Sequence, residues 1–183
     1  MPNLSLKEVI YRWRVRTCLV CLILVVLLAR PVLASLLAGV ILCFFGLAIR
    51  AWAAGHLRKE KELTVSGPYS FTRNPLYLGN FVIGISVATA SCSWWILSLF
   101  IVYFLLFYPL VIKKEEEKMS ALFPEEFEEY REKVPLFFPS FKKASLARKS
   151  KFSSKLYRKN REWRAFVGAL FFWLILAAKM MIS

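Results

Sequence analysis

The amino-acid sequence predicts an all-α integral membrane protein, a helical bundle with about five transmembrane helices in one domain over residues 1–183. Hydrophobic residues make up 58% of the chain, and the mean hydropathy is +0.51. A water-soluble protein of this size could hardly bury so much apolar surface, whereas a bilayer accommodates it. The apolar residues also gather in runs of membrane-spanning length, and Lys and Arg gather between those runs.

The first two spans are expected over residues 17–33 and 32–54, after an interfacial lead-in helix at 1–16. The first span is marginal, because only thirteen residues separate Arg16 from Arg30. As a helix they cover about 20 Å of a hydrocarbon core about 30 Å thick. Near the end of the second span, Arg50 either snorkels to the interface or faces a polar cavity.

Two further spans are expected in the 39 uncharged residues from 74 to 112. This length holds two membrane-crossing helices with a turn at 91–93, and Trp94 and Trp95 would lie at the interface beside it. Because the turn is short, the two helices must form a tight antiparallel hairpin. Small residues are expected to let these two helices approach closely: Gly79, Gly84, Ser86 and Ala88.

The second half of the chain is expected to alternate between charged surface helices and membrane. Pro109 should kink the fourth span near its end, and a charged helix with acidic residues at its start should follow at 113–133. The apolar stretch 134–139 is bounded by proline and should touch the membrane. Residues 142–164 hold ten Lys or Arg and one acid, which is typical of a basic amphipathic helix on the membrane surface. The last span is expected at 165–182.

The distribution of basic residues predicts which end of the bundle faces the cytoplasm. Lys and Arg precede the first span and separate the second from the third and the fourth from the fifth, whereas the opposite turns carry only Arg30. The positive-inside rule then places the N-terminus in the cytoplasm and the C-terminus outside. All the polar segments that could perform chemistry fall on the cytoplasmic side. The net charge of +14 is therefore attributed to contact with anionic membrane lipids, and nucleic acid is not an expected partner.

Sequence motifs for metals, redox chemistry and nucleotide phosphates are not evident. Cys18 and Cys21 have the spacing of a metal or redox pair, but no second pair follows, so they are expected to be small packing residues. One histidine and scattered cysteines do not build a metal site. There is no GxSxG motif, no Rossmann fingerprint, no glycine-rich phosphate loop and no evident cleavable signal peptide.

The polar segments offer groups that suit a zwitterionic or nucleoside-bearing ligand. Arg73 provides a planar fork for a carboxylate or phosphate, and Glu115 could hold an ammonium group or a ribose diol. The ring faces of Tyr69 and Tyr77 attract a cation such as a sulfonium. His56 either takes a proton from an acceptor or is a structural histidine at the interface. Each of these residues, taken alone, also has a plain structural explanation as an anchor, a turn or a solvated helix face.

Taken together, these segments resemble the isoprenylcysteine carboxyl methyltransferase family, which is related to the membrane phospholipid N-methyltransferases. The pattern is Gly67-Pro68-Tyr69, then Arg73-Asn74-Pro75-Leu76-Tyr77-Leu78-Gly79, then Glu115-Glu116, Phe123, Glu126-Phe127, Tyr130 and Val134-Pro135. The order and the spacing of these residues agree with the family as well as their types. The resemblance covers roughly residues 46–139.

The resemblance implies a membrane enzyme that holds S-adenosyl-methionine at the cytoplasmic face. The implied cofactor contacts are Lys61, Glu62, Leu63, Thr64, Tyr69, Asn74, Pro75, Leu76, Tyr77 and Glu115. The candidate catalytic residues are Arg73 and His56, and the candidate substrate-binding residues are Arg50 and Lys113. Two positions depart from the family pattern. Many members have histidine where Asn74 stands, and the eukaryotic members have arginine where Val111 stands.

The expected function is methyl transfer from S-adenosyl-methionine to a lipidic or small carboxylate, thiol or amine acceptor. Displacement at a sulfonium methyl gains mainly from alignment and desolvation. A carboxylate acceptor needs no general base, whereas a lipid ammonium must first lose a proton. The alternatives are a membrane phospholipid N-methyltransferase, an NADPH-dependent sterol or lipid reductase, and a non-catalytic scaffold or small transporter. A transporter should carry mid-membrane charges or internal repeats, and apart from Arg50 the sequence has neither.

Overall fold

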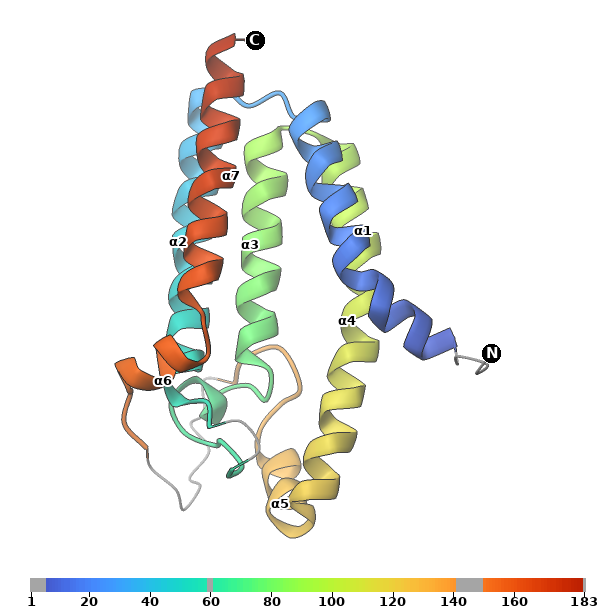
Figure 1. The fold of residues 1–183 in the computed structure, drawn as a ribbon, viewed down its shortest axis with the longest axis vertical. Coiled ribbons are helices and arrows are strands. Elements are labelled where there is room, and N and C mark those ends of the chain that lie inside the picture. Colours follow the sequence, from blue (N-terminus) through green and yellow to red (C-terminus); the bar gives the residue numbers. More distant parts are fainter. Residues whose placement is uncertain (1–5, 59–60, 141–149, 183) are drawn as a thin grey trace.

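The computed structural model describes residues 6–58, 61–140 and 150–182, and every regular element in these ranges is helical (Figure 1). The elements are α1 (Leu6–Leu28), α2 (Leu33–His56), the 3-10 turn η1 (Gly67–Ser70), α3 (Pro75–Ser91), α4 (Trp94–Leu122), α5 (Pro124–Lys133), α6 (Ser154–Lys159) and α7 (Trp163–Ile182). The expectation of an all-α membrane bundle is confirmed.

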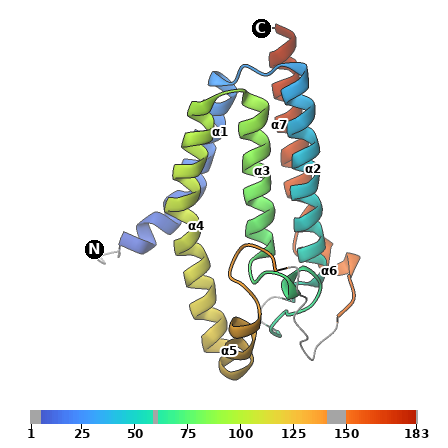
Figure 2. The same cartoon turned by 180° about the vertical axis from the view of Figure 1, so that it is seen from behind.

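Five helices, α1, α2, α3, α4 and α7, run along the long axis of the molecule (Figures 1 and 2). Among the described residues, α2, α4 and α7 are long and apolar enough to cross a membrane. The helix α3 has 17 residues, and the apolar part of α1 covers Arg16–Leu28. The five predicted spans are thus all helices, and three of them meet the length and hydropathy of a span by themselves. Large apolar side chains such as Phe44, Leu105 and Phe171 are exposed on the bundle, where lipid would cover them.

Both tight turns lie at one end of the bundle with the C-terminus of α7, and we call this the turn end (Figure 1). Cys92 has a left-handed conformation, with φ of 49°, and ends α3 inside the predicted turn. The two turns are joined, because the Arg30 backbone N–H donates to the Ser91 carbonyl at 3.0 Å and the Ser35 hydroxyl donates to the Ala90 carbonyl at 3.1 Å. The opposite end, which we call the loop end, carries the α2–α3 connection, α5, residues 134–140 and residues 150–162. The polar segments predicted to share one end therefore do so.

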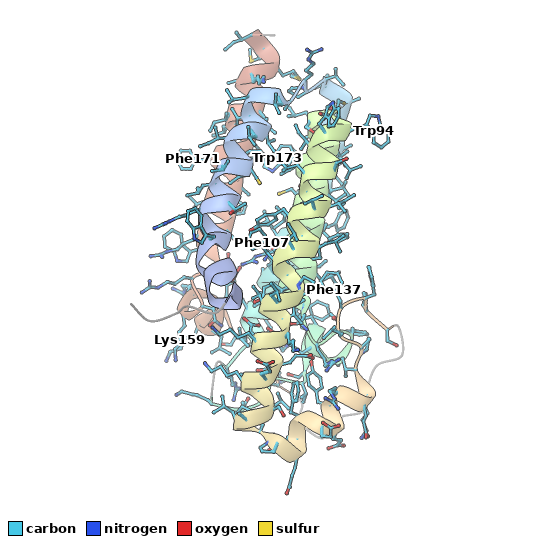
Figure 3. The ribbon with its side chains drawn as sticks, turned by 90° about the vertical axis from the view of Figure 1, so that its right-hand side faces the viewer. Trp94, Phe107, Phe137, Lys159, Phe171 and Trp173 are labelled. Carbon is cyan, nitrogen blue, oxygen red and sulfur yellow. The ribbon has the colours of Figure 1, made fainter. Side chains whose placement is uncertain are left out.

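The turn end is closed by apolar side chains from all five long helices. The buried cluster consists of Val25, Ala29, Leu36, Ala88, Ala90, Ile96 and Leu176. Lys179 completes it, because its ammonium donates to the carbonyls of Val26 at 2.6 Å and Leu27 at 2.7 Å, two of the last carbonyls of α1. Trp94 is 82% exposed and points away from the bundle (Figure 3), as expected for a tryptophan at a membrane interface.

The small residues of α3 pack mainly against α2, so the expectation that they serve the α3–α4 contact is wrong for Gly79 and Ser86. A Cβ atom on Gly79 would come within 2.8 Å of the Gly46 carbonyl oxygen, and a Cβ atom on Gly39 would come within 2.8 Å of the Ser86 carbonyl oxygen. Gly84 does face α4, where Phe100 fills the space above it. The physical reason is size: the α3–α4 contact is filled by large aromatic rings, whereas α2 and α3 approach backbone to backbone.

The helix α4 continues through Pro109 and ends at Leu122, so the separate helix predicted at 113–133 starts in the wrong place. At 29 residues, α4 is about 43 Å long, which exceeds a hydrocarbon core of about 30 Å. Its charged last turns therefore extend beyond the membrane-spanning part, and the carboxylates there do not stand at a helix N-terminus. The break comes at Phe123, because the following Pro124 disfavours helical geometry in the residue before it.

The basic tail is not one long surface helix. Residues 142–149 lie outside the described residues, and within 150–164 only Ser154–Lys159 is helical before α7 begins. Arg161 has a φ of 58° and turns the chain into α7. The tail docks on the end of α2: the Ser153 backbone N–H donates to the Gly55 carbonyl at 2.9 Å. Docking satisfies helix-terminal carbonyls that a free surface helix would leave to water.

Candidate active site

A cavity of about 1020 Å³ lies at the loop end and is bounded by α1, α2, α3, α4 and α5. Small-molecule sites usually occupy about 300–1,000 Å³, so this cavity has room for a nucleoside-bearing molecule beside part of a second ligand. Eleven of the fourteen residues predicted for the site line it: Arg50, Glu62, Leu63, Thr64, Tyr69, Arg73, Asn74, Pro75, Leu76, Tyr77 and Glu115. Segments that are distant in the sequence therefore meet around one space.

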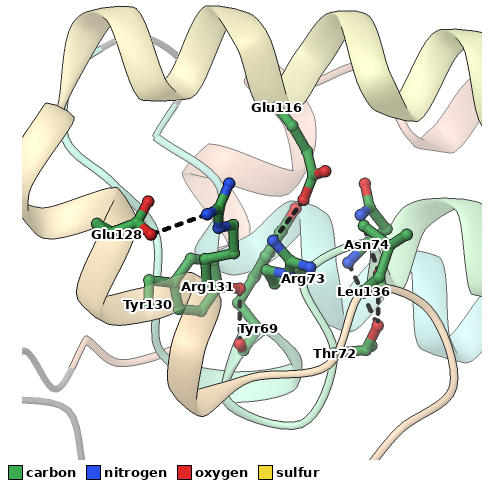
Figure 4. A network of polar contacts seen from close by, with 9 residues as sticks. All are labelled: Tyr69, Thr72, Arg73, Asn74, Glu116, Glu128, Tyr130, Arg131 and Leu136. Atoms are coloured by element: carbon green, nitrogen blue, oxygen red, sulfur yellow. Dashed lines mark hydrogen bonds and ion pairs between the residues drawn. The ribbon is translucent and has the colours of Figure 1, made fainter.

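Arg73 lies at the centre of the polar wall (Figure 4). Its Nη1 is 2.6 Å from Oε1 of Glu116, and the two side chains are 11% and 26% exposed. This ion pair is short but poorly aligned. Within the described structure, Nε and Nη1 of Arg73 are buried and make no hydrogen bond. The charge of Arg73 is matched by Glu116 within the cavity wall, and buried N–H groups without a well-aligned acceptor are costly.

The loop that carries Arg73 is fastened to residues 134–140. The Arg73 backbone N–H donates to the Pro135 carbonyl at 2.9 Å, and the Thr72 hydroxyl donates to the Phe137 carbonyl at 2.7 Å. The amide of Asn74 donates to the Leu136 carbonyl at 3.0 Å (Figure 4). Asn74 thus has a structural role as well as a place in the cavity wall, and an amide suits that role because it is a neutral donor.

The stretch 134–139 only partly fulfils the expectation that it touches the membrane. Val134 is buried under α5, and Phe137 packs against Phe81 of α3 and Phe104 of α4, with ring centroids 5.9 and 5.5 Å away. Leu136 and Phe138 are exposed. Anchored between α3 and α4, this segment holds the Arg73 loop in place.

Two buried tyrosines support the cavity floor. The Tyr130 hydroxyl on α5 donates to the Tyr69 carbonyl at 2.8 Å. Burial raises the pKa of Tyr69 well above its ordinary value, and Tyr130 and Glu115 nearby raise it further. Burial also raises the pKa of Tyr130, although the Arg73 charge opposes this shift. Both side chains are therefore neutral phenols across the physiological pH range.

A carboxylate and several aromatic rings form the opposite wall. The Tyr77 hydroxyl on α3 donates to Oε1 of Glu115 on α4 at 2.6 Å. The Tyr77 ring meets the Tyr108 ring edge to face, with centroids 5.4 Å apart. A negative charge beside aromatic faces is an arrangement that binds cations. Glu117, two residues further along α4, is exposed and does not line the cavity.

Three predicted site residues are not brought to the cavity. Lys61 and Lys113 are exposed and are not among its lining residues. His56 is buried, with Nδ1 3.0 Å from the Trp52 carbonyl oxygen and its ring 6.2 Å from that of Phe152. A Cβ atom on Gly67, which has a φ of 63°, would come within 2.7 Å of the His56 ring. The geometry supports the structural interpretation of His56.

Sequence reasoning missed Asn80 and Glu162, which hold Arg50. Glu116, which holds Arg73, belongs to the Glu115-Glu116 pair of the family pattern. Both missed residues had a signal in the sequence. Asn80 is a polar residue within the uncharged run 74–112, and Glu162 is the single acid in the basic stretch 142–164. Among the described residues, no group of three or more His, Cys, Asp or Glu could hold a metal ion.

Comparison with known proteins finds relatives of this chain by sequence. The chain is 40% identical over 94 residues to the nickel-cobalt-cadmium resistance protein NccN of Alcaligenes xylosoxydans xylosoxydans. The aligned segment covers 49% of this chain and 43% of the relative. The chain is 38% identical over 114 residues to the cobalt-zinc-cadmium resistance protein CzcN of Cupriavidus metallidurans. This second aligned segment covers 60% of this chain and 50% of the relative. The chain thus spans about half the length of the curated relatives it matches. No solved structure matches.

The family profile described as phospholipid methyltransferase matches residues 24–126, which is more than half of the chain. The matched segment contains the cavity residues from Arg50 to Glu116 and ends before α6 and α7. This result confirms the resemblance expected from the sequence at the level of the family. The chain therefore belongs to the phospholipid methyltransferase family.

Proposed function

We propose that this protein is an integral membrane methyltransferase that uses S-adenosyl-methionine and acts on a lipid-borne or small acceptor. The observation that carries the proposal is the cavity itself, which the side chains of Arg73, Glu115 and Tyr77 line together. The family supports methyl transfer as the reaction. The positive-inside rule supports a cytoplasmic loop end and a cytoplasmic N-terminus.

The cavity wall suits S-adenosyl-methionine group by group. Arg73 would bind the carboxylate of its amino-acid part, and Glu115 would bind the ammonium group or the ribose diol. The rings of Tyr77 and Tyr108 would lie beside the positively charged sulfur. Leu63 and other apolar wall residues would contact the adenine. When bound, this cofactor supplies an electrophilic methyl group on a sulfonium.

The residues of this chain would orient the ligands and exclude water. Glu116 holds the Arg73 guanidinium in place, and the buried cluster beneath α5 closes the cavity floor. The neutral phenol of Tyr69 adds no competing charge. Glu115 is the carboxylate placed to take a proton from an amine acceptor, since His56 does not line the cavity.

The acceptor would approach from the bilayer. The cavity reaches past the loops to Cys18 and Leu19 in the apolar part of α1 and to Tyr103 in the apolar part of α4. Orientation can be checked with a membrane-impermeant maleimide, because Cys92 is exposed at the turn end. In intact cells, Cys92 should react from outside, and protection of Cys92 there would contradict a cytoplasmic loop end.

The cofactor is tested by isothermal titration of the full chain in detergent. S-adenosyl-homocysteine should bind, and binding of NADPH alone would favour a reductase. Arg73→Ala and Glu115→Ala should each weaken S-adenosyl-homocysteine binding about tenfold or more, because each removes a charge-assisted hydrogen bond. Glu117→Ala is the matched control on the same helix and should change the affinity less than about twofold. Full affinity in both site variants, with unchanged thermal unfolding, would remove the site assignment.

A further inference from the structure

The cavity has an inner end that lies among the helices α1, α2, α3 and α4. Its lining residues there are Cys18, Leu19, Arg50, Leu76, Tyr77, Asn80, Tyr103, Tyr108 and Val111. Among these described residues, Arg50 is the only one with a charged side chain. The chemistry of the inner end therefore depends on how Arg50 is held.

Glu162 neutralises Arg50 through a bidentate ion pair. Nε of Arg50 donates to Oε2 at 3.0 Å, and Nη2 donates to Oε1 at 2.9 Å and to Oε2 at 2.7 Å. Nη1 donates to Oδ1 of Asn80. A guanidinium has five N–H groups, and Glu162 occupies the edge formed by Nε and Nη2. Because Asn80 holds Nη1, all three nitrogens of Arg50 are already engaged.

Both partners of the pair are fixed. The side chains of Arg50 and Glu162 are 16% and 12% exposed. The Asn160 amide donates to the carbonyls of Ala54 at 2.9 Å and Leu57 at 3.0 Å, so the backbone beside Glu162 is tied to the end of α2. The stem of Arg50 lies against Gly79, where a Cβ atom would come within 2.5 Å of its Cγ. A ligand would have to break this arrangement to replace Glu162.

We propose that the Arg50–Glu162 pair makes the inner end selective against anionic acceptors, so that the acceptor group bound there is an amine, thiol or hydroxyl rather than a carboxylate or phosphate. An anionic group beside Arg50 would meet the like charge of Glu162 in a partly buried place, where such repulsion is weakly screened. The charge of Arg50 is already compensated by Glu162, so Arg50 would not attract a second anion as a free guanidinium would. The inference rests on the proposed function, because it takes the methyl acceptor to occupy this cavity.

Glu162 lies outside the segment 24–126 that matches the family. The selectivity would therefore be set by a part of the chain that the family match does not cover.

The experiment compares two probes of equal chain length, dodecanoate and methyl dodecanoate. Binding to the full chain in detergent is measured with S-adenosyl-homocysteine present, at a pH where the carboxylate is ionised. The wild-type protein should bind the ester more tightly. Glu162→Gln should raise the affinity for dodecanoate relative to the ester about tenfold, because it leaves the Arg50 charge uncompensated. Glu117→Gln, the matched control, should leave the ratio unchanged.

Two results would overturn the inference: a wild-type preference for dodecanoate, or an unchanged ratio in a folded Glu162→Gln variant. Should that variant fail to fold, the double variant Arg50→Gln/Glu162→Gln removes both charges and should keep the wild-type preference for the ester. A switch of the double variant to dodecanoate would also contradict the inference. Binding of S-adenosyl-homocysteine is measured separately, so a failure of the proposed cofactor is distinguishable from a failure of the acceptor selectivity.

Discussion

The two ends of this bundle are built from the same long helices but satisfy their polar groups differently. At the turn end, the C-terminal carbonyls of α1 are met by Lys179, and an apolar cluster fills the space between the helices. At the loop end, α4 and α2 lie on opposite sides of α3 (Figure 2), and Arg73 keeps buried N–H groups without hydrogen bonds in the described structure. The polar groups of the turn end are satisfied by the chain itself, whereas the loop end holds buried polar atoms without hydrogen bonds in the described structure.

This difference separates stability from ligand binding along the axis of the molecule. Buried polar groups left without partners are expensive, and proteins retain them mainly where a ligand or a reaction uses them. The apolar turn end offsets that cost, because burial of its side chains needs no ligand. Changes at the turn end should therefore alter stability alone, and matching changes at the loop end should alter stability and ligand selectivity together.

Matched substitutions of two glycines at the α2–α3 contact test this difference between the two ends. Gly39→Ala lies toward the turn end and would place its Cβ atom 2.8 Å from the Ser86 carbonyl oxygen. Gly79→Ala lies toward the loop end and would meet the Gly46 carbonyl oxygen at 2.8 Å and Arg50 Cγ at 2.5 Å. Each should destabilise the protein by about 1–3 kcal/mol through overpacking. The higher helix propensity of alanine would offset up to about 1 kcal/mol of this.

Only Gly79→Ala should also change the affinity ratio of dodecanoate to methyl dodecanoate, because it displaces Arg50 from Glu162. Thermal unfolding in detergent and the two-probe binding assay measure the two effects. Gly168→Ala is the control, since a Cβ atom there has nothing within 4 Å. Equal changes of the probe ratio in both glycine variants would show that the two ends are not independent.

The sequence predicts the fold well where a helix is defined by its own residues. The long uncharged run, the turn at 91–93 and the shared end of the polar segments follow from hydropathy, chain length and charge. Prediction from the sequence fails where the position of a residue depends on its contacts with another helix. The charged helix expected to start at residue 113 is the continuation of α4, which ends at Leu122. The small residues of α3 face α2, because large aromatic rings already fill the contact with α4.

Prediction of the candidate site from the sequence has the same limit. The family pattern brings together Arg73, Tyr77 and Glu115, since their types and order are visible in the sequence. The partners that hold a guanidinium are not visible, because a carboxylate 112 positions away has no periodic relation to Arg50. Glu162 was noticeable only as the one acid in a basic stretch, which resembles a solvated charge until its contact is known.

The smallest expected effect concerns the buried phenol of Tyr130, which supports the loop end from below. Tyr130→Phe removes the hydrogen bond to the Tyr69 carbonyl and should cost about 1 kcal/mol of unfolding free energy at neutral pH. In the unfolded chain a tyrosine ionises near about pH 10, whereas burial raises the pKa of Tyr130 in the folded protein. The unfolded state therefore loses a proton first as the pH rises. Wild-type stability should fall from about pH 10 upward.

Thermal unfolding of the wild type and of Tyr130→Phe across the alkaline range measures this effect. The variant should start less stable and then lose stability less steeply, so the two curves should converge as the pH rises. Tyr69, whose pKa is also raised by burial, keeps some alkaline dependence in the variant. Tyr157→Phe, at a half-buried tyrosine on α6, is the control for the loss of a phenol elsewhere in the chain. Parallel curves for the wild type and Tyr130→Phe would mean that the Tyr130 phenol meets water, and the cavity floor would then be open instead of sealed by α5.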